Sequence, residues 1–274
     1  MAAETNRGTQ YDPAALDRVE RRFWRDIWDS MPHELTSEHG IELREFGALQ
    51  VTLTRDLPQV PILNLMLGAP EATEADLDYA IAWADEHGVS PCVPVTPGLP
   101  GSEQAEEWLQ RKGLEHGYAW MKFVRDPHPP RFLAPEIEVI ELTAADEEPF
   151  GTIAAVGFGM PAWAGGFFAH LPGRDGWRCY VARVEGKAQA CAALLIDDGI
   201  AEFGIAATLE EARGRGCQTA LLHRRILDAA EAGCHTLFVE TGERVPDRPS
   251  GSYRNILKAG FEEAYARPNW QRRR

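Results

Sequence analysis

The segment ARGRGCQTALLHRR, residues 212–225, places two glycines and two arginines ahead of an apolar pattern that is typical of a helix. Gly214 and Gly216 can adopt backbone conformations that other residues rarely take, so successive N–H groups can converge on one anion. The positive end of the helix dipole attracts negative charge, and Arg213 and Arg215 can donate charge-assisted hydrogen bonds to phosphate oxygens. The pattern predicts a pyrophosphate-binding turn, although glycines at such a corner can also serve the turn alone.

The segment matches neither a Walker loop, GxxxxGK[ST], nor the dinucleotide fingerprint GxGxxG. It resembles the acyl-CoA motif of the GNAT superfamily of N-acetyltransferases, [Q/R]xxGx[G/A], read from Arg213 to Gln218 as RGRGCQ. Gln218 departs from the motif, because the family has a small residue there that allows close backbone approach. Residues 206–222 are similar to the family's strand, turn and helix, and residues 252–270 to its closing helix and strand. The resemblance covers roughly residues 136–270.

The resemblance implies that acetyl-CoA, or another acyl-CoA, is the co-substrate. Backbone groups at the end of the strand before the turn would run along the pantetheine arm, splayed from the next strand. Amides of the turn and of the first helical residues would hold the pyrophosphate. An asparagine on the final helix matches one that reaches the cofactor in many relatives, and it can equally be a polar residue on the helix surface. The cofactor-binding candidates are Ala206, Ala207, Thr208, Arg213, Gly214, Arg215, Gly216, Cys217, Gln218, Thr219 and Asn255.

Acyl transfer to an amine needs a base for the ammonium proton, groups that stabilise the oxyanion, and an acid for the departing thiolate. Glu202 is the candidate base, because it lies eleven residues before the motif, where some family members carry a catalytic glutamate. In a regular strand it projects to the same side as Ala206 and Thr208. A solvated strand carboxylate is the alternative. The family's usual acid, a tyrosine, is Ile256 here, so Tyr253 is the nearest substitute, with packing as its alternative role.

The stretch MPAWAGGFFAHLPGRDGW, residues 160–177, is rich in aromatic residues and glycine. In GNAT-like proteins this region lines the acceptor pocket, while aromatic residues can also simply cover a core. A cysteine nucleophile is not expected, because the sequence places no histidine to activate one. HELTSEH, residues 33–39, lacks the HExxH spacing of a zinc site, so no metal is predicted. The acceptor-binding candidates are Trp163, Phe167, Phe168 and His170.

The chain has 274 residues and a formal net charge of −14, from 28 Lys and Arg against 42 Asp and Glu. Nucleic-acid binding needs Lys and Arg to neutralise phosphates, so nucleic acid is not expected as a partner. The sequence begins without the apolar core of a secretory signal, and no stretch is apolar over the length of a membrane span. The five cysteines are scattered without a CxxC pair, which is typical of reduced thiols. These features predict a soluble cytoplasmic protein that does not bind membranes.

Hydrophobic periodicity and turn residues predict the elements that position these candidates. A helix over 73–88 opens with Thr73 and Asp76 in a capping arrangement, and a helix over 143–159 opens with Thr143 and Asp146 in the same way. A further helix of about five turns begins within ARGRGCQTALL. Strands are predicted over 91–96, at a sheet edge because of its prolines, and over 136–143, 178–184, 188–196, 200–208, 235–241 and 261–266, with a helix over 250–260.

A proline-rich segment over 125–135 interrupts the patterning and marks a domain boundary. On either side, KGLEHGYAWM (112–121) and AGFEEAYARP (259–268) share a glycine, an apolar residue, a glutamate and Tyr-Ala. Such matches suggest tandem copies of one fold. The fold class is therefore α+β, with each copy a mixed, mostly antiparallel sheet flanked by helices. Residues 1–128 are predicted to be a degenerate GNAT-like domain that shapes or caps the acceptor site, and residues 129–274 an acyl-CoA-binding GNAT domain.

Together these patterns predict an N-acetyltransferase of the GNAT type, which moves an acetyl or other acyl group from acyl-CoA to an amine of a small-molecule acceptor. The amine would attack directly in a ternary complex. The first half reads LNLMLGAPEAT where a second RGRG would fall, so one ligand turn per chain is expected. The alternative is a non-catalytic acyl-CoA-binding sensor or regulatory module, which the missing tyrosine favours and Glu202 opposes.

Overall fold

The computed structural model describes residues 9–146, 149–245 and 250–272. The chain divides into two compact units: unit 1 is Met1–Val19 with Lys122–Ala264, and unit 2 is Glu20–Met121 with Tyr265–Arg274. Each unit includes a segment from the other end of the chain. The division between the units therefore differs from the predicted boundary between residues 128 and 129. Residues 1–8, on which part of the expectation about a secretory signal rests, lie outside the described residues.

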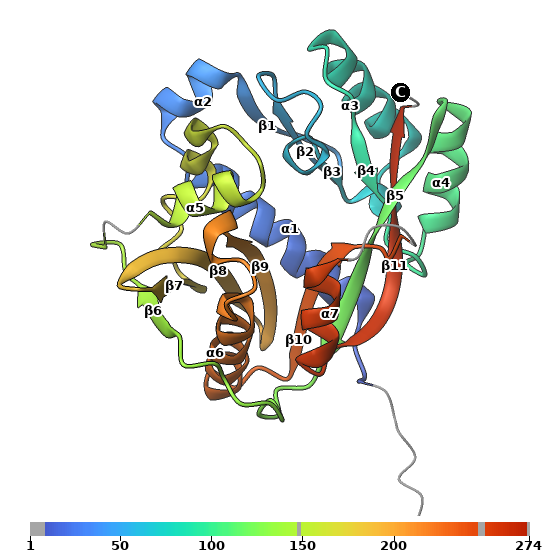
Figure 1. The fold of residues 1–274 in the computed structure, drawn as a ribbon. Helices are drawn as coiled ribbons and strands as arrows, with labels where there is room; N and C mark the ends of the chain where they lie inside the picture. The colour runs from blue at the N-terminus through green and yellow to red at the C-terminus, as the bar shows by residue number, and fades with distance from the viewer. Residues whose placement is uncertain (1–8, 147–148, 246–249, 273–274) are drawn as a thin grey trace, which may run out of the picture. The chain divides into compact units, whose positions relative to one another are not determined.

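Unit 1 is built on a sheet in which β10, β9, β8, β7 and β6 follow one another in that order (Figure 1). The strands from β6 to β9 are antiparallel, and β10 runs parallel to β9. Short turns join β7, β8 and β9, as the sequence predicted. The bounds are β6 Glu138–Leu142, β7 Trp177–Val184, β8 Lys187–Asp197, β9 Ile200–Thr208 and β10 Thr236–Gly242, and each confirms a predicted strand. Strand β5, Leu114–Arg125, is the other neighbour of β10 and belongs to unit 1 from Lys122 onward.

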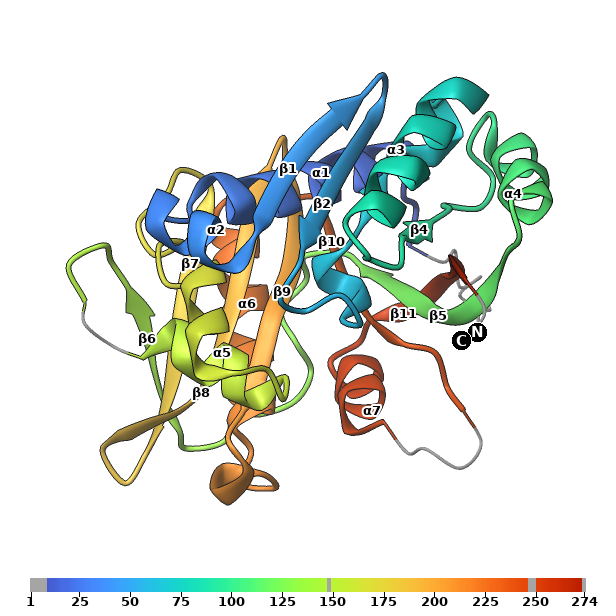
Figure 2. The ribbon, with the colours of Figure 1, turned by 90° about the horizontal axis from the view of Figure 1, so that it is seen from above.

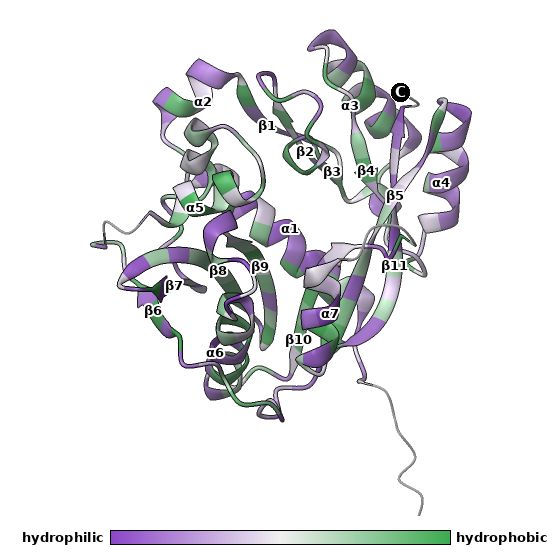
Figure 3. Cartoon of the chain, in the orientation of Figure 1, coloured by the Kyte–Doolittle hydropathy of each residue, from purple (hydrophilic) through white to green (hydrophobic). Residues whose placement is uncertain are grey.

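Helices α5 and α6 cover opposite faces of β8 and β9 (Figure 2). Figure 3 shows that hydrophobic residues run along β10, in the interior of this sheet. Two 3-10 helices are present in this unit: η3 follows α5, and η4 follows β9. Helix α7 precedes the last strand, β11. The bounds are α5 Phe150–Gly157, η3 Ala162–Phe167, η4 Glu210–Ala212, α6 Cys217–Glu231, α7 Gly251–Lys258 and β11 Glu262–Arg272, with Pro13–Val19 of α1 (Pro13–Asp29) also in unit 1.

The predicted start of the helix over 143–159 is wrong, and the helix after the glycine turn is shorter than the predicted five turns. Thr143 donates its N–H and its hydroxyl to Asp146, at 2.6 and 2.7 Å, but this pair closes a turn, and α5 begins only at Phe150. Proline fits the start of a helix and not its interior, so Pro149 precedes the first helical residue. Residues 147 and 148 of the predicted helix lie outside the described residues. Helix α6 has 15 residues, about four turns, because the glycines ahead of Cys217 form a turn and not helix.

Unit 2 has a three-stranded antiparallel sheet, β1-β2-β3, and a second sheet in which β11 lies between β4 and β5. Helix α3 begins with the predicted capping box of Thr73 and Asp76, and β4 is an edge strand as predicted. The core includes Trp83, Trp108 and Trp270. The bounds are α2 His33–His39, β1 Ile41–Phe46, β2 Leu49–Thr54, η1 Pro61–Leu63, β3 Met66–Leu67, η2 Ala69–Glu71, α3 Glu74–Glu86, β4 Cys92–Pro94 and α4 Ser102–Arg111.

The segments predicted to be repeats have the same order of elements. Helix, strand, helix and strand follow one another as α3, β4, α4 and β5 in one case and as α6, β10, α7 and β11 in the other. A glycine in the left-handed region ends the first helix of each set, at Gly88 and Gly233, and another precedes each last strand, at Gly113 and Gly260. The predicted α+β class, with mixed sheets flanked by helices, is confirmed. Within the described residues, no helix is both long and apolar enough to cross a membrane.

Candidate functional site

Strand β9 contains a β-bulge close to its end. Its pairing with β8 shifts by one residue between Cys191 and Ala193, where β9 advances from Ala207 to Gly204. Ile205 lies in this bulge with φ of 49°, a left-handed conformation that costs a β-branched residue energy. Bulges bend a strand and often redirect side chains next to functional sites.

The bulge changes which residues of β9 share a face. Glu202 and Ala207 pair with residues that are four apart on β8, so both project to the same side. The expectation that Glu202 lies on one face with Ala206 and Thr208 is therefore wrong, because an extra residue inverts the alternation. A Cβ at Gly157 of α5 would lie 2.6 Å from the Ala207 methyl, so this is the face that α5 covers.

Strands β9 and β10 pair only at their beginnings. The parallel register joins Ile200–Phe203 to Thr236–Val239, although β9 continues to Thr208 and β10 to Gly242. Beyond Phe203, the backbone N–H and C=O groups on this edge of β9 do not pair with β10 and can bond other groups. The resemblance implied such a separation of the two strands, with the pantetheine arm running along the end of β9.

The predicted turn lies between η4, which follows β9, and α6. Gly214 and Gly216 have φ of 77° and 93°, and Gly216 is the residue before the helix, without any side-chain hydrogen bond to its first N–H groups. Arg213 is exposed, and Arg215 forms an ion pair of 2.7 Å with Glu185. Uncapped N–H groups together with the helix dipole make this end of α6 suitable for an anion.

The corresponding helix of unit 2 starts differently. Thr73 accepts a hydrogen bond from the Asp76 N–H at 3.2 Å, and Asp76 accepts from the Thr73 N–H at 2.9 Å. The hydrogen bond from the Thr73 hydroxyl, followed by that from its backbone, lowers the pKa of Asp76. Glu74 adds a second acidic residue to the first turn. An end that is already capped and carries negative charge does not suit a phosphate.

Gln218, which departs from the family motif, reaches back to β9. Its Nε2 donates to the Ala207 carbonyl at 3.1 Å and to the Thr208 hydroxyl at 2.9 Å. Ala206 is exposed. The side chain therefore joins the first turn of α6 to the end of β9 and points toward that strand, while the helix N–H groups remain at the turn. Thr219 follows in the same helical turn and is half-buried.

Two ionisable side chains that no sequence motif indicates lie on the same face of the sheet as Glu202. Lys122 of β5 and Glu240 of β10 form an ion pair of 2.7 Å, and the lysine is almost fully buried, with 1% of its side chain exposed. Glu202 is buried, at 4% exposure, and pairs in register with Phe238, two residues before Glu240. The signal that could have drawn attention to Lys122 is a single charge within the apolar segment AWMKFV.

Tyr253 and Asn255 lie on α7 at different depths. Tyr253 is buried and packs edge-on against Phe123 at 4.8 Å between ring centroids. Its hydroxyl donates a hydrogen bond to Glu263, and burial, followed by this bond, raises its pKa to about 12. Asn255 is half-buried. The tyrosine thus keeps its proton at neutral pH but already shares it with a carboxylate.

The aromatic candidates after α5 are not equivalent. Phe167 and Phe168 are buried in the core, whereas Trp163 is half-buried and His170 is exposed. Phe158, at the end of α5, is 47% exposed and packs edge-on against Phe168. Of the four predicted acceptor residues, therefore, only Trp163 and His170 present substantial surface in this structure.

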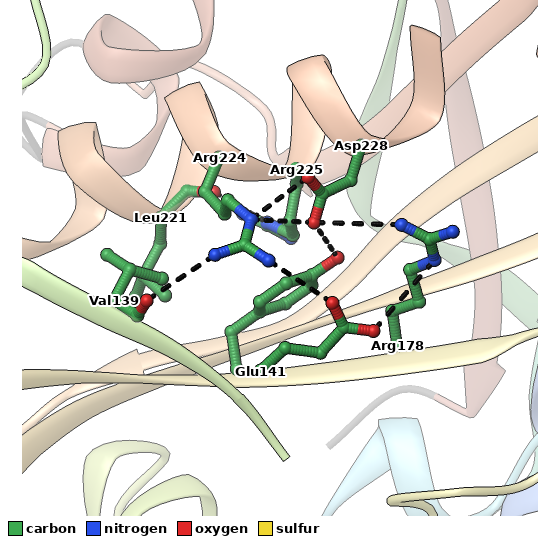
Figure 4. Close-up of polar contacts among 8 residues, drawn as sticks. Val139, Glu141, Arg178, Leu221, Arg224, Arg225 and Asp228 are labelled. Carbon is green, nitrogen blue, oxygen red and sulfur yellow. Dashed lines mark hydrogen bonds and ion pairs between the residues drawn. The ribbon is translucent and has the colours of Figure 1, made fainter. Parts of the chain in front are cut away.

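Helix α6 is fixed to the sheet by a polar cluster on the face opposite α5 (Figure 4). Asp228 accepts hydrogen bonds from the Tyr180 hydroxyl at 2.7 Å and from Arg224 Nε at 2.8 and 2.9 Å. Arg224 also donates to Glu141 of β6 at 3.2 Å, and Arg178 lies 3.8 Å from Asp228. Burial raises the pKa of Tyr180, so its hydroxyl remains a donor. The cluster holds the helix that follows the predicted anion-binding turn.

Arg225 is buried one residue further along α6. It donates to the carbonyls of Ala193 at 2.9 Å and Gly204 at 3.5 Å, which pair with each other next to the bulge. Its guanidinium also lies 4.8 Å above the Phe203 ring. Burial lowers the pKa of Arg225 to about 10, which leaves it charged at neutral pH. A cation that serves two carbonyls at the bulge stabilises the irregular end of β9.

Replacing Asp228 by alanine is expected to lower the free energy of unfolding by about 2–3 kcal/mol, because Arg224 and Tyr180 lose a buried acceptor. Tyr180→Phe removes one bond and should cost ~1 kcal/mol. Urea denaturation measures both. Glu231→Ala, on an exposed position of the same helix, is the control and should change stability by less than about 0.5 kcal/mol. Equal stability of Asp228→Ala and the control would contradict a structural role for the cluster.

The cysteines are buried and free. Burial raises the pKa of the Cys191 thiol to about 12 and also raises that of Cys217. A thiol that stays protonated is a poor nucleophile, so neither residue suits a covalent acyl intermediate. Among the residues that the structure describes, no group of three His, Cys, Asp or Glu side chains is arranged to hold a metal ion.

No protein-family model matches the sequence, and no curated protein sequence matches it significantly. Several solved structures are similar in fold. A GCN5-related N-acetyltransferase from Kribbella flavida has a TM-score of 0.60 and 18% identity, with 95% of each chain covered. A GCN5-related N-acetyltransferase from Sphaerobacter thermophilus has a TM-score of 0.56 and 14% identity, over 96% of this chain and 93% of that one. A tandem GNAT protein from the clavulanic acid biosynthesis pathway also has a TM-score of 0.56 and 14% identity, over 95% of this chain and 96% of that one. The predicted tandem GNAT-like fold is confirmed.

Proposed function

We propose that this chain, which has the tandem fold of GCN5-related N-acetyltransferases, is itself an acyltransferase. It would move an acetyl or other acyl group from acyl-CoA to an amine of a small-molecule acceptor, by direct attack in a ternary complex. The observation that carries the proposal is the uncapped, glycine-led start of α6 at the end of a bulged strand that has separated from β10. The capped and acidic start of α3 supports a single cofactor site per chain.

The residues at this turn suit a diphosphate. Both glycines have left-handed φ values, and a side chain at Gly214 would meet no other atom within 4 Å, so the turn is open. Backbone N–H groups from Gly214 to Thr219 would hold the diphosphate, with Arg213 adding charge. The end of β9, from Ala206 to Thr208, would bind the pantetheine arm, and Asn255 is the candidate contact from α7. Acyl-CoA supplies a thioester, which is the activated form of the acyl group.

Glu202 is the proposed general base. An amine is mostly protonated at neutral pH, so a carboxylate must remove its proton before the nitrogen can attack a carbonyl. Glu202 is buried on the face covered by α5, close to where β9 and β10 separate. The assignment of Tyr253 as general acid remains a prediction. Its hydroxyl is already donated to Glu263, so the departing thiolate would take its proton from Tyr253 only if that bond were exchanged.

Glu202→Gln is expected to slow amine-dependent release of free thiol from acetyl-CoA by roughly 100-fold or more, because the amide cannot accept the proton. Affinity for acetyl-CoA should stay close to that of the unchanged protein. The measurement is a thiol-release assay with a panel of primary amines over a pH series, alongside calorimetric titration. Full turnover of Glu202→Gln at every pH would move the base elsewhere.

The first test of the proposal is calorimetric titration of acetyl-CoA, free CoA and a longer acyl-CoA into the purified chain. We expect one site per chain and a preference among the acyl groups. Failure of all three ligands to bind would contradict the proposal. The titration also tests the cofactor assignment independently of the acceptor, which need not be known.

A non-catalytic acyl-CoA sensor is the second candidate function. The observation that favours it is the engagement of Tyr253, together with Ile256 at the position of the family's usual acid. A sensor would bind acyl-CoA at one site and release no thiol with any amine tested. Binding accompanied by amine-dependent thiol release would exclude this alternative.

A further inference from the structure

Three ionisable side chains gather on one face of the unit 1 sheet, where a protein interior would normally be apolar. Lys122, Glu240 and Glu202 come from the neighbouring strands β5, β10 and β9. Lys122 Nζ lies 2.7 Å from Glu240 Oε2 and 5.4 Å above the Phe238 ring. Because Phe238 pairs with Glu202, and Glu240 lies two residues further on the same face, all three side chains belong to one cluster.

The cluster lies at the separation of β9 and β10. Val239 is the last residue of β10 that pairs with β9, so Glu240 is the first residue beyond the pairing, and Glu202 lies within its final two rows. If the function proposed for this chain is right, the proton of the acceptor amine is removed here. The ion pair is therefore close to the proposed base along the sheet.

Stability gives no sufficient reason for such a pair. Lys122 is 1% exposed and Glu240 19% exposed, so the cost of leaving water falls mainly on the ammonium, and apolar residues of the same size often replace a buried pair without loss. Lys122 is nevertheless buried in an otherwise apolar strand segment. A charge retained in this environment acts strongly on its neighbours, because little water screens it.

We propose that the Lys122–Glu240 pair is a positioning device for Glu202: it balances the charge beside that carboxylate so that Glu202 stays ionised and can accept the proton of an ammonium group. The purpose that we assign to the pair rests on the proposed function, whereas the experiment that tests the pair does not. With all three groups ionised, the cluster carries one net negative charge, which matches a singly charged ammonium. The acceptor that fits this charge is an amine entering in its protonated form.

The elements around β9 differ in the charged groups that they carry. Helix α5, which covers this face, has no ionisable residue in FGTIAAVG. On the same face of β8, Asp197 forms an ion pair of 2.7 Å with Arg18 of α1 and lies opposite Ile200, the first residue of β9. Arg18 also pairs with Asp198, at 3.3 Å, and its neighbour Asp17 is a buried acidic residue of α1. The ion pair of Lys122 and Glu240 lies on this face at the strand separation.

Removing the charge of Lys122 and removing that of Glu240 are expected to shift the pKa of Glu202 in opposite directions. Removing the lysine charge leaves Glu240 beside Glu202, and two neighbouring carboxylates resist simultaneous ionisation, so the pKa of Glu202 rises. Removing the Glu240 charge leaves the ammonium, which favours the ionised form, so the pKa of Glu202 falls. Removing both charges should return it close to its original value.

The experiment follows the Glu202 carboxyl by carbon-13 NMR in glutamate-labelled full-length protein, with Glu202→Gln identifying its resonance. We expect its titration midpoint to rise by about one pH unit in Lys122→Met, to fall by about one unit in Glu240→Gln, and to return in the double variant. No ligand is present, so the result does not depend on turnover. If Lys122→Met does not fold, Glu240→Gln alone still tests the sign.

The possible results test the role of the ion pair separately from the acyltransferase function. An unchanged midpoint in the folded variants would overturn the role of the pair, whatever the activity of the protein. Midpoints that shift as expected, in a protein that releases no thiol with any amine, would support the pair and contradict the acyltransferase function. If both proposals hold, the acid limb of the thiol-release profile should move in the same direction as the NMR midpoint in each variant.

Discussion

Gly214→Glu is expected to weaken acetyl-CoA binding by at least about 30-fold, which corresponds to ~2 kcal/mol. The substitution puts a carboxylate into the turn where the N–H groups and the dipole of α6 would attract a diphosphate. No other atom lies within 4 Å of the added Cβ, so a clash does not explain such a loss. Calorimetric titration of acetyl-CoA measures it directly.

The same helix offers a matched control. Gly233 follows α6 with φ of 78°, against 77° at Gly214, and its added Cβ would also meet nothing within 4 Å. Gly233→Glu therefore carries the same backbone strain and the same charge, and it should leave the affinity for acetyl-CoA unchanged. Equal losses in both variants would mean that strain or net charge, and not the turn, governs binding.

Glu20→Gln is expected to lower the stability of unit 2 by about 3–5 kcal/mol, the largest effect on folding that we predict. Glu20 of α1 and Arg267 of β11 are each 1% exposed, and Arg267 Nη2 donates to Glu20 Oε1 at 2.7 Å. The guanidinium also lies 5.4 Å above the Trp120 ring. Removing the carboxylate charge leaves the guanidinium buried without that counterion, which is the costly state.

Urea denaturation followed by tryptophan fluorescence suits this test, since six of the eight tryptophans lie in unit 2: Trp24, Trp28, Trp83, Trp108, Trp120 and Trp270. The double variant Glu20→Leu with Arg267→Met should recover most of the loss, because apolar residues replace both charges. Glu45→Gln is the control. It breaks the exposed pair of Arg25 and Glu45, which also joins α1 to a strand, and should cost less than about 1 kcal/mol. Similar costs in both single variants would contradict the importance of burial.

Features that depend on neighbouring residues could be predicted from the sequence. The hairpins of β7, β8 and β9 follow from alternation and short turns, and the capping box of α3 follows from Thr73 and Asp76. The turn ahead of α6 could be predicted because its glycines are close together in the sequence, and its role in binding an anion stays a prediction. The same local reasoning failed at Thr143 and Asp146, because the same pair of residue types also closes a simple turn when a proline follows.

Features that depend on distant residues could not be predicted. The bulge places Ile205, a residue with no preference for left-handed φ, in a conformation that its neighbours on other elements support, among them Arg225 on α6. The face of Glu202 relative to the end of β9 was therefore mispredicted. The pairing of Lys122 with Glu240 needs two strands that are far apart in the sequence. No periodicity within a single segment contains this information.

The exchange of chain ends has a consequence for biosynthesis. Translation completes residues 20–121 long before residues 265–272, yet it is this last stretch that pairs with β4 and supplies the counterion of Glu20. Until it emerges from the ribosome, a nascent chain carries an open strand edge and a core that lacks Trp270. A nonsense mutation near codon 265 should therefore damage the part of the protein that was synthesised first, and chaperones would meet that part while it is still incomplete.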